Sequence, residues 1–346
     1  MPKVSVLMTV YNGFPYIKDA ISSILNQSFS DFELIIIDDA STDETANTIE
    51  IFNDRRIRYF KNSTNMGITR SANRGLSLAK SPYIARIDAD DVSLPERLAR
   101  QVEYLDQNQD IGVVGSAIRE IDTKGRFLRS WNPPTSPQLI KWSLNLFDPI
   151  AHSTVLMRRK LVEQVQGYAN EMETVEDYDL WRRLSKITKI ANLSDVFGLI
   201  RRHSTNITKI RSGFHRERRI KVSQLMISDY LNKEISYETV RQIIDLEFDN
   251  KEDVQASAKV LSNLMRKGLN DCSGRPQDRQ FIKQYAALRL LSISINGLNE
   301  KIYWKLLLSS GKLDPYVFWR AFNSKLDHLL LNLKMKLYNT IDLYIT

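Results

Sequence analysis

The sequence has few of the features that mark disulfide-rich, fibrous or membrane-spanning proteins. Its 346 residues include a single cysteine, Cys272, so no internal disulfide can form. Only 13 glycines and 10 prolines are present, which excludes collagen-like and low-complexity chains. No uncharged apolar stretch reaches the roughly 18 residues of a spanning helix, and the first residues lack a secretory signal pattern. These absences predict a cytoplasmic protein whose membrane contact, if any, is peripheral, at the inner face of the cell membrane.

The remaining composition is that of a globular protein with a sizeable core. Hydrophobic residues make up 42% of the chain and charged residues 26%. Because single cores tend to split beyond about 250 to 300 residues, we expect two structural units. The net charge of +8 allows anionic lipid, phosphorylated substrates or nucleic acid as partners, and composition does not choose among them.

Apolar runs and amphipathic helices alternate from residue 3 to about residue 90. Strands are expected at Val4–Val10, Phe32–Ile37, Ile57–Phe60 and Tyr83–Ile87. This alternation is typical of βαβ units and predicts a mainly parallel sheet. Ser41 with Glu44, and Ser93 with Glu96, match the capping-box pattern and predict two helix starts.

The second half of the chain changes from mixed to helical character. We expect a hairpin from Ile111–Ile121 and Arg126–Trp131, and later strands at 154–157 and 196–201. Strand patterns end near residue 213, so we predict an α/β domain over 1–213 and a helical region over 214–346. An apolar stripe from Leu326 to Leu337 fits either an interfacial helix on a membrane or packing against the other helices.

Acidic residues follow two of the predicted strands. Asp88, Asp90 and Asp91 come directly after the fourth strand, and Asp38 and Asp39 end the second. Crowded carboxylates repel one another unless a cation intervenes, and Mg²⁺ or Mn²⁺ prefers such oxygen ligands. The alternative is that these acids only organise turns and helix starts.

Five segments in this order resemble the family 2 glycosyltransferases, which have the GT-A fold. They are Thr9–Asn12, Ile37–Asp43, Asn65–Ile68, Asp88–Asp91 and Glu176–Asp177. The fourth is similar to the metal motif of that family, and the fifth to its Glu-Asp motif. The resemblance covers residues 3 to about 205.

The resemblance implies a GT-A-like α/β sandwich that binds a nucleoside-diphosphate sugar, with a preference for uridine. It implies Asp177 as the catalytic base of an inverting transfer, with Asp90 and His203 as ligands of Mn²⁺ or Mg²⁺. The nucleotide-sugar residues that it implies are Thr9, Tyr11, Asn12, Asp39, Asn65, Gly67, Arg70, Asp88 and Ala89. His152 also falls where members of the family place a histidine, although a structural role is the simpler interpretation.

The implied partners are a sugar nucleotide and a saccharide or lipid-linked saccharide acceptor, with no nucleic acid, in cell-envelope or capsular polysaccharide synthesis. A basic segment, residues 201–221, could meet phosphates or anionic lipid, or could be a solvated helix face. Two alternatives stay open. One is a non-catalytic subunit that binds a partner; the other is a nucleotidyltransferase, which would need a glycine-rich loop where Tyr11–Pro15 lies.

Overall fold

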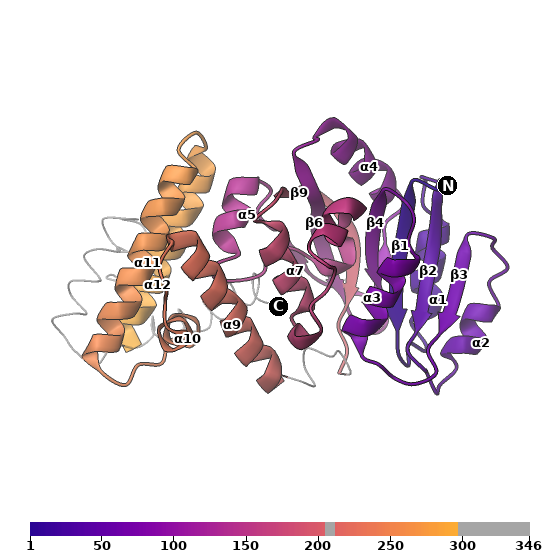
Figure 1. Cartoon of the computed structure of the whole chain (residues 1–346), viewed down its shortest axis with the longest axis horizontal. Coiled ribbons are helices and arrows are strands. Elements are labelled where there is room, and N and C mark those ends of the chain that lie inside the picture. The colour runs from indigo at the N-terminus through magenta and orange to yellow at the C-terminus, as the bar shows by residue number, and fades with distance from the viewer. Residues whose placement is uncertain (205–211, 297–346) are drawn as a thin grey trace. The chain divides into compact units, whose positions relative to one another are not determined.

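The computed structural model describes residues 1–204 and 212–296 and divides the chain into two compact units (Figure 1). The first unit comprises Met1–Pro137 and Ile150–Arg218. The second comprises Gln138–Pro149, here called the inserted segment, and the chain from Arg219 onward. The predicted domain boundary at residue 213 stays a prediction. The apolar stripe at Leu326–Leu337 lies outside the described residues.

A mixed sheet forms the centre of the first unit. Its strands are β1 Val4–Val10, β2 Phe32–Asp38, β3 Ile57–Lys61, β4 Tyr83–Asp88, β5 Val92–Ser93, β6 Ile111–Ile121, β7 Phe127–Trp131, β8 Leu156–Arg158 and β9 Lys189–Arg201. They follow the order β3-β2-β1-β4-β8-β6-β9-β5, and β7 pairs with β6. Strands β1 to β4 pair in parallel, as do β6 and β9, while β8 is antiparallel to both β4 and β6. The predicted mainly parallel sheet is confirmed.

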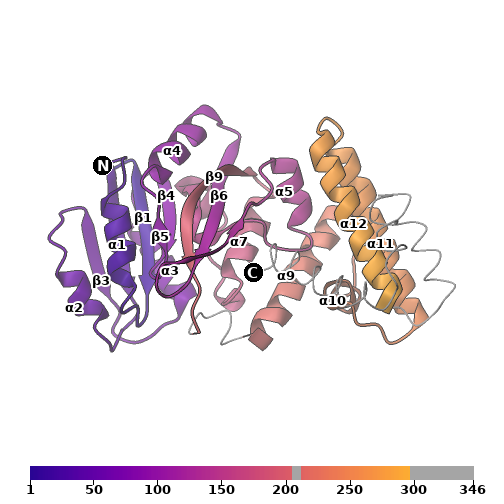
Figure 2. The ribbon, with the colours of Figure 1, turned by 180° about the vertical axis from the view of Figure 1, so that it is seen from behind.

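Helices cover both faces of this sheet. They are α1 Ile17–Leu25, α2 Thr45–Glu50, α3 Ile68–Leu78, α4 Arg97–Gln107, α6 Arg159–Gln164 and α7 Glu176–Leu184, with short 3₁₀ helices η1 His152–Thr154 and η2 Asn170–Met172. Helix α3 lies on the face seen in Figure 1, whereas α1 and α4 lie on the opposite face, seen in Figure 2. Every residue of β1 and β2 is therefore buried, as expected of parallel strands covered on both faces.

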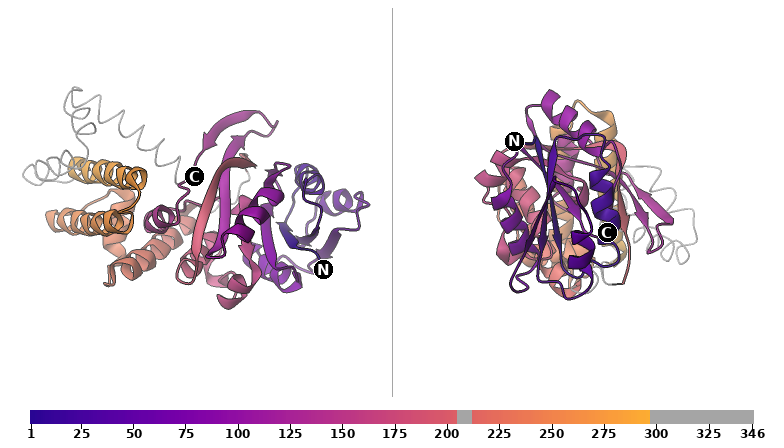
Figure 3. Two further views of the ribbon diagram at one scale, coloured as in Figure 1. Left: turned by 90° about the horizontal axis from the view of Figure 1, so that it is seen from above. Right: turned by 90° about the vertical axis from the view of Figure 1, so that its right-hand side faces the viewer.

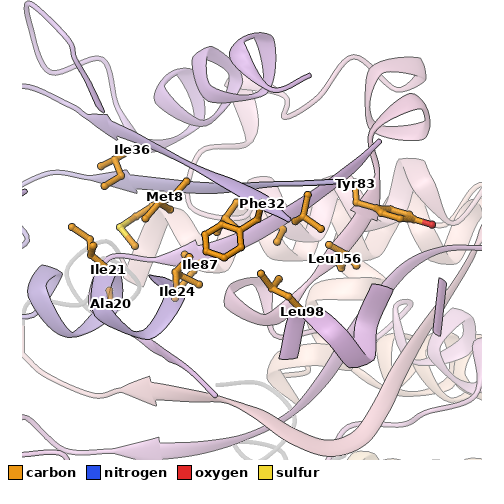
Figure 4. Close-up of a cluster of buried hydrophobic side chains, with 14 of the residues drawn as sticks. Met8, Ala20, Ile21, Ile24, Phe32, Ile36, Tyr83, Ile87, Leu98 and Leu156 are labelled. Carbon is orange, nitrogen blue, oxygen red and sulfur yellow. The ribbon is translucent and has the colours of Figure 1, made fainter. Parts of the chain in front are cut away.

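The main core of the first unit lies between the sheet and helices α1 and α4. Met8 of β1 packs with Ile21 and Ile24 of α1, and Leu98 of α4 joins the same cluster (Figure 4). On the other face, Gly75 lets α3 approach β1 closely, because a Cβ there would lie 2.0 Å from Leu7 Cδ1. Because successive side chains of β1 point to opposite faces of the sheet, Met8 packs into the core on one face and Leu7 into the core on the other.

The second unit is helical in its described part. It contains α5 Pro137–Ser143 from its second residue on, most of α9 Ser212–Leu231, and α10 Tyr237–Asp245, α11 Lys251–Asp271 and α12 Pro276–Asn296. Trp142 is fully buried and donates a hydrogen bond from Nε1 to the Leu264 carbonyl at 3.0 Å. Its indole ring packs against Gly268, where a Cβ would lie only 2.4 Å away. Among the helices of residues 1–204 and 212–296, none has both the length and the apolar composition of a membrane span.

Both predicted capping boxes are wrong. Helix α2 begins at Thr45 and α4 at Arg97, and neither has a side-chain cap at its N-cap residue. The Ser41 hydroxyl instead accepts a hydrogen bond from the Asn12 amide, and Ser93 lies in β5. Ser41 and Ser93 therefore bond to residues far away in the sequence and do not cap the helices that the local pattern predicted.

Candidate functional site at the carboxyl edge of the sheet

Three strands bring polar residues to one edge of the sheet. In the parallel register, Val10 of β1 lies beside Asp38 of β2, and Thr9 lies beside Asp88 of β4. Ligands of open α/β sheets bind at the carboxyl ends of the strands. The register thus places the predicted residues Thr9, Asp39 and Asp88 at the edge where a ligand is expected.

Asp39 organises the loop between β3 and α3. Its Oδ1 accepts hydrogen bonds from Asn62 Nδ2 at 2.6 Å and the Met66 amide at 2.8 Å. Its Oδ2 accepts one from the Gly67 amide at 2.8 Å. The φ of Gly67 is 88°, a conformation that glycine adopts without strain. Asp39 is 3% exposed, and these hydrogen bonds occupy three acceptor positions of its carboxylate.

The loop after β1 is fixed by its own polar groups. The Asn12 amide donates to Ser41 Oγ, and Asn12 Oδ1 accepts from the Thr42 amide, both at 2.9 Å. Asn12 has φ 54°, which asparagine tolerates better than most residues. Tyr11 is 52% exposed, so its ring is accessible to a ligand. The Asn12 side chain shapes this loop, and the rings of Tyr11 and Phe14 are its exposed aromatic groups.

A fully buried arginine, Arg86 of β4, holds two of the predicted residues. Its Nη2 donates to Thr9 Oγ1 at 2.7 Å and pairs with Asp88 Oδ1 at 3.1 Å. Its Nη1 donates to the carbonyls of Leu7 and Ile87. An isolated buried charge is costly, so Arg86 and Asp88 stabilise each other. Arg86 therefore fixes the orientation of both Thr9 and Asp88.

The two predicted metal ligands lie together. His203 Nε2 is 2.8 Å from Asp90 Oδ2, and the His203 ring stacks on Tyr16 with centroids 5.1 Å apart. Arg201 donates from Nε to the Asp90 carbonyl at 3.0 Å and from its amide to Asp91 Oδ1 at 2.9 Å. The end of β9 thus holds the acidic segment that follows β4.

The donor set fits a divalent cation that shares its coordination with a substrate. Burial, and then the charges of Asp90 and Asp88, raise the pKa of Asp91 well above its usual value. Metal ligands must be deprotonated, so Asp91 is a poorer candidate ligand than the neighbouring Asp90. Within residues 1–204 and 212–296, no group of three or more acidic, histidine or cysteine side chains could hold a metal. A Mg²⁺ or Mn²⁺ ion would therefore need phosphate oxygens, as these ions commonly do.

Glu176 and Asp177 begin α7 and have different environments. Glu176 is buried, and its Oε2 has no hydrogen-bond partner in the described part of the chain. Burial, and then the charge of Asp177, raise the pKa of Glu176 to about 8. Asp177 is only partly buried, and its Oδ1 accepts a hydrogen bond from the Tyr178 amide. Different surroundings for adjacent carboxyl groups are a common basis for separate catalytic roles.

His152 lies in η1 and contacts a tyrosine that α3 holds in place. Its Nε2 is 2.8 Å from the Tyr168 hydroxyl, and Tyr168 is held by two backbone hydrogen bonds to the Asn73 side chain of α3. Burial, and then the charge of Arg86, lower the pKa of His152, while the charges of Asp177 and Asp88 act in the opposite direction.

The first turns of α9 hold the turn before α7. Thr174 has φ 80°, a conformation unfavourable for a β-branched residue. Its carbonyl is 2.8 Å from His215 Nδ1, and Arg218 donates to the carbonyl of Glu173. Glu173 also lies against Gly67. Arg218, predicted as part of a basic surface for phosphate or lipid, thus contacts protein backbone.

The predicted residues fall into two groups. Thr9, Asp39, Ala89 and Asp90 lie at the carboxyl edge, while Asn65 and Arg70 are exposed residues of the loop before α3 and of its first turn. Arg86 and Tyr168 were not among the residues predicted from the sequence. A signal for Arg86 was available, because a lone arginine inside an apolar strand requires buried partners.

Comparison with known proteins decides the family. The model of glycosyl transferase family 2 matches residues 5–165. An uncharacterized glycosyltransferase from Haemophilus influenzae is 30% identical over 276 residues, which cover 76% of this chain and 84% of the relative. The chain is a family 2 glycosyltransferase. The O-antigen biosynthesis glycosyltransferase WbnJ from Escherichia coli is 35% identical over 184 residues, 52% of this chain and 71% of WbnJ.

Solved structures show the same fold. TarS 1-349 of S. aureus, in complex with UDP-GlcNAc, has a TM-score of 0.56 at 18% identity and covers 90% of this chain and 91% of that chain. The mannosyltransferase PcManGT from Pyrobaculum calidifontis, in complex with GDP-Man and Mn2+, has a TM-score of 0.50 at 16% identity, with 97% of this chain and 86% of that chain covered. The predicted GT-A-like fold of the glycosyltransferase is confirmed, and the nucleotidyltransferase alternative is removed.

Proposed function

We propose that the glycosyltransferase transfers a sugar from a UDP-linked donor to a hydroxyl of a saccharide or lipid-linked acceptor, with inversion at the anomeric carbon. The observation that carries this proposal is that Thr9, Asp39 and Asp88 lie together at the carboxyl edge of the sheet. The place of Asp177 beside them is part of the proposal. The complex of TarS with UDP-GlcNAc supports the choice of nucleotide. The name of WbnJ supports a role in cell-envelope or capsular polysaccharide synthesis, and the single cysteine supports a cytoplasmic location.

In this proposal, each residue of the edge has its own role. Asp39 and Tyr11 bind the base, while Asp88, oriented by Arg86, binds the ribose. Asp177 removes the proton of the acceptor hydroxyl as that oxygen bonds to the donor's C1 carbon and the bond from C1 to the diphosphate breaks. Neutral Glu176 beside it adds no second negative charge near the attacked carbon.

Asp90 and His203 would hold a Mn²⁺ or Mg²⁺ ion, whose charge stabilises the departing diphosphate when bound. The Mn2+ in the PcManGT complex supports this assignment. The peripheral membrane contact and the nucleotide residues Asn12, Asn65, Gly67, Arg70 and Ala89 stay predictions.

The test combines nucleotide binding with turnover. UDP binding, measured by calorimetry, should require Mn²⁺ or Mg²⁺ and should be lost in EDTA. Asp177→Asn should keep UDP affinity but lower kcat by about 10²- to 10⁴-fold, the range of general base catalysis. Wild-type turnover in Asp177→Asn would contradict the assignment of Asp177 as the base. Metal-dependent UDP binding with no turnover of any sugar nucleotide would favour a non-catalytic subunit.

A further inference from the structure

One face of the hairpin formed by β6 and β7 contains a hollow of about 410 Å³. This volume falls within the roughly 300 to 1,000 Å³ of small-molecule sites. The hairpin extends away from the body of the first unit (Figure 3). The hollow is lined by Arg119, Ile121, Gly125, Phe127, Ser130 and Leu199.

The strand register places this hollow next to the acidic segment. Arg119 of β6 lies opposite Ser130 of β7 on one side and Leu199 of β9 on the other. Leu199 pairs in turn with Val92 of β5, which directly follows Asp91. Strands β4 and β6 run in the same direction, because β8 is antiparallel to both. The hairpin therefore continues the edge that carries the candidate site.

Arg201 joins the hairpin to the acids directly. It lies opposite Ile121, a wall of the hollow, and its Nη1 donates to the Asp122 carbonyl in the hairpin turn at 3.4 Å. Its backbone amide donates to Asp91 Oδ1. Arg201 thus contacts both the turn of the hairpin and the acidic segment.

The lining residues offer an aromatic ring and a positive charge. Phe127 is 60% exposed, which leaves a large apolar surface open to a ligand. Arg119 is exposed, and its guanidinium makes no hydrogen bond or ion pair within the described part of the chain. The neighbouring arginines differ, because Arg126 pairs with Asp122 and Arg129 pairs with Glu120. Arg119 therefore presents an uncompensated charge beside an aromatic ring.

We propose that this hollow binds a sugar or polyol unit of the acceptor that carries a carboxylate or phosphate group. The apolar C–H face of the unit packs on Phe127, and its acidic group pairs with Arg119, whose planar fork suits both anions. Ser130 adds a hydroxyl partner. The inference rests on the proposed function, since it names the chemical class of the acceptor.

The experiment compares three oligomers as ligands of the full chain: an oligogalacturonate, a glycerol phosphate oligomer and neutral maltohexaose. Calorimetry should show that one anionic oligomer binds at least about fivefold more tightly than maltohexaose, near the upper limit for one exposed charge pair. Arg119→Gln should abolish that preference, and Phe127→Ser should weaken binding of the preferred oligomer. The preferred oligomer identifies the source of the charge, carboxylate or phosphate.

Arg126→Gln is the matched control, because it removes the same charge from the same hairpin outside the hollow. It should leave affinity for the preferred oligomer unchanged. Equal losses in Arg119→Gln and Arg126→Gln would overturn the proposal in favour of a diffuse basic surface. Absence of binding by both anionic oligomers would also overturn it, as would Phe127-dependent binding of anionic vesicles alone. UDP binding, measured in every variant, should persist, and its absence would count against the proposed function and not against the hollow.

Discussion

Two buried arginines of β4 and α4 differ in what they contact. Arg86 contacts the side chains of Thr9 and Asp88, whereas Arg97 donates to the carbonyls of Arg86 and Val155. Burial lowers the pKa of Arg97 to about 9. Both side chains support the fold, but only Arg86 is bonded to predicted donor-binding groups.

Replacement of Arg86 by lysine should therefore damage donor binding. Lysine keeps the charge but cannot donate to Thr9 and Asp88 together, so Arg86→Lys should raise the donor KM about tenfold, near 1.4 kcal/mol, with a smaller change in kcat. Arg97→Lys should lower the free energy of unfolding but leave the donor KM unchanged. Initial rates over a range of donor concentrations give both constants. Equal KM values in the two variants would assign Arg86 a purely structural role.

Glu176 should make stability depend on pH. Its pKa rises from 4.5 in the unfolded chain to about 8 in the folded one, so the folded state holds the proton more tightly. The free energy of unfolding should then fall as pH rises from about 5 to 8, by more than ~1 kcal/mol, since each pKa unit corresponds to about 1.4 kcal/mol. Glu176→Gln should flatten this dependence. Urea denaturation at pH 5, 6.5 and 8 measures it, and parallel curves for the two proteins would contradict the shift.

At the scale of elements, α9 and the turn before α7 depend on each other. Arg218 and His215 hold the carbonyls of Glu173 and Thr174, which lie three and two residues ahead of the first residue of α7. Because small displacements of a catalytic group can cost up to about 10²-fold in rate, Arg218→Gln should lower kcat by roughly tenfold while the donor KM changes little. Phe214→Ser, at an exposed position of the same helix, is the control. Unchanged kcat in Arg218→Gln would show that the turn is fixed without α9.

The elements that were predicted correctly are those whose sequence carries a regular local pattern. The strands up to Asp88 and the hairpin of β6 and β7 were predicted because hydrophobic periodicity and turn residues decide them. The capping boxes failed because Ser41 and Ser93 have partners far away in sequence. Strand β9 begins at Lys189, ahead of the predicted residue 196, since its first residues are fixed by pairing with β6.

Only part of the candidate site could be predicted from the sequence. Family motifs indicated Asp90, His203 and Asp177, and the structure brings His203 to Asp90 across the fold. The contacts of Arg86 with Thr9 and of Tyr168 with His152 depend on which strands are neighbours. Sequence patterns do not contain that information.

At the scale of the whole molecule, the inserted segment makes the second unit depend on residues from the first half of the chain. Trp142 and Phe147 belong to the core that α11 and α12 complete. A chain ended at residue 213 would expose these side chains, and exposing one large buried apolar side chain costs about 1.5 to 3 kcal/mol. We expect that truncation to aggregate and to bind the dye ANS, whereas a chain ended after Asn296 keeps the Trp142 packing. A soluble 1–213 fragment with wild-type UDP affinity would contradict this.

The path of the chain also limits how such an enzyme can change over evolutionary time. The backbone passes between the two units at three points, after Pro137, Pro149 and Arg218. A recombination event that joined a new helical module at the last of these points would leave Gln138–Pro149 matched to the old one. We therefore expect the second unit to diversify by substitutions in both the inserted segment and the C-terminal helices. Exchange of the C-terminal helices alone is not expected.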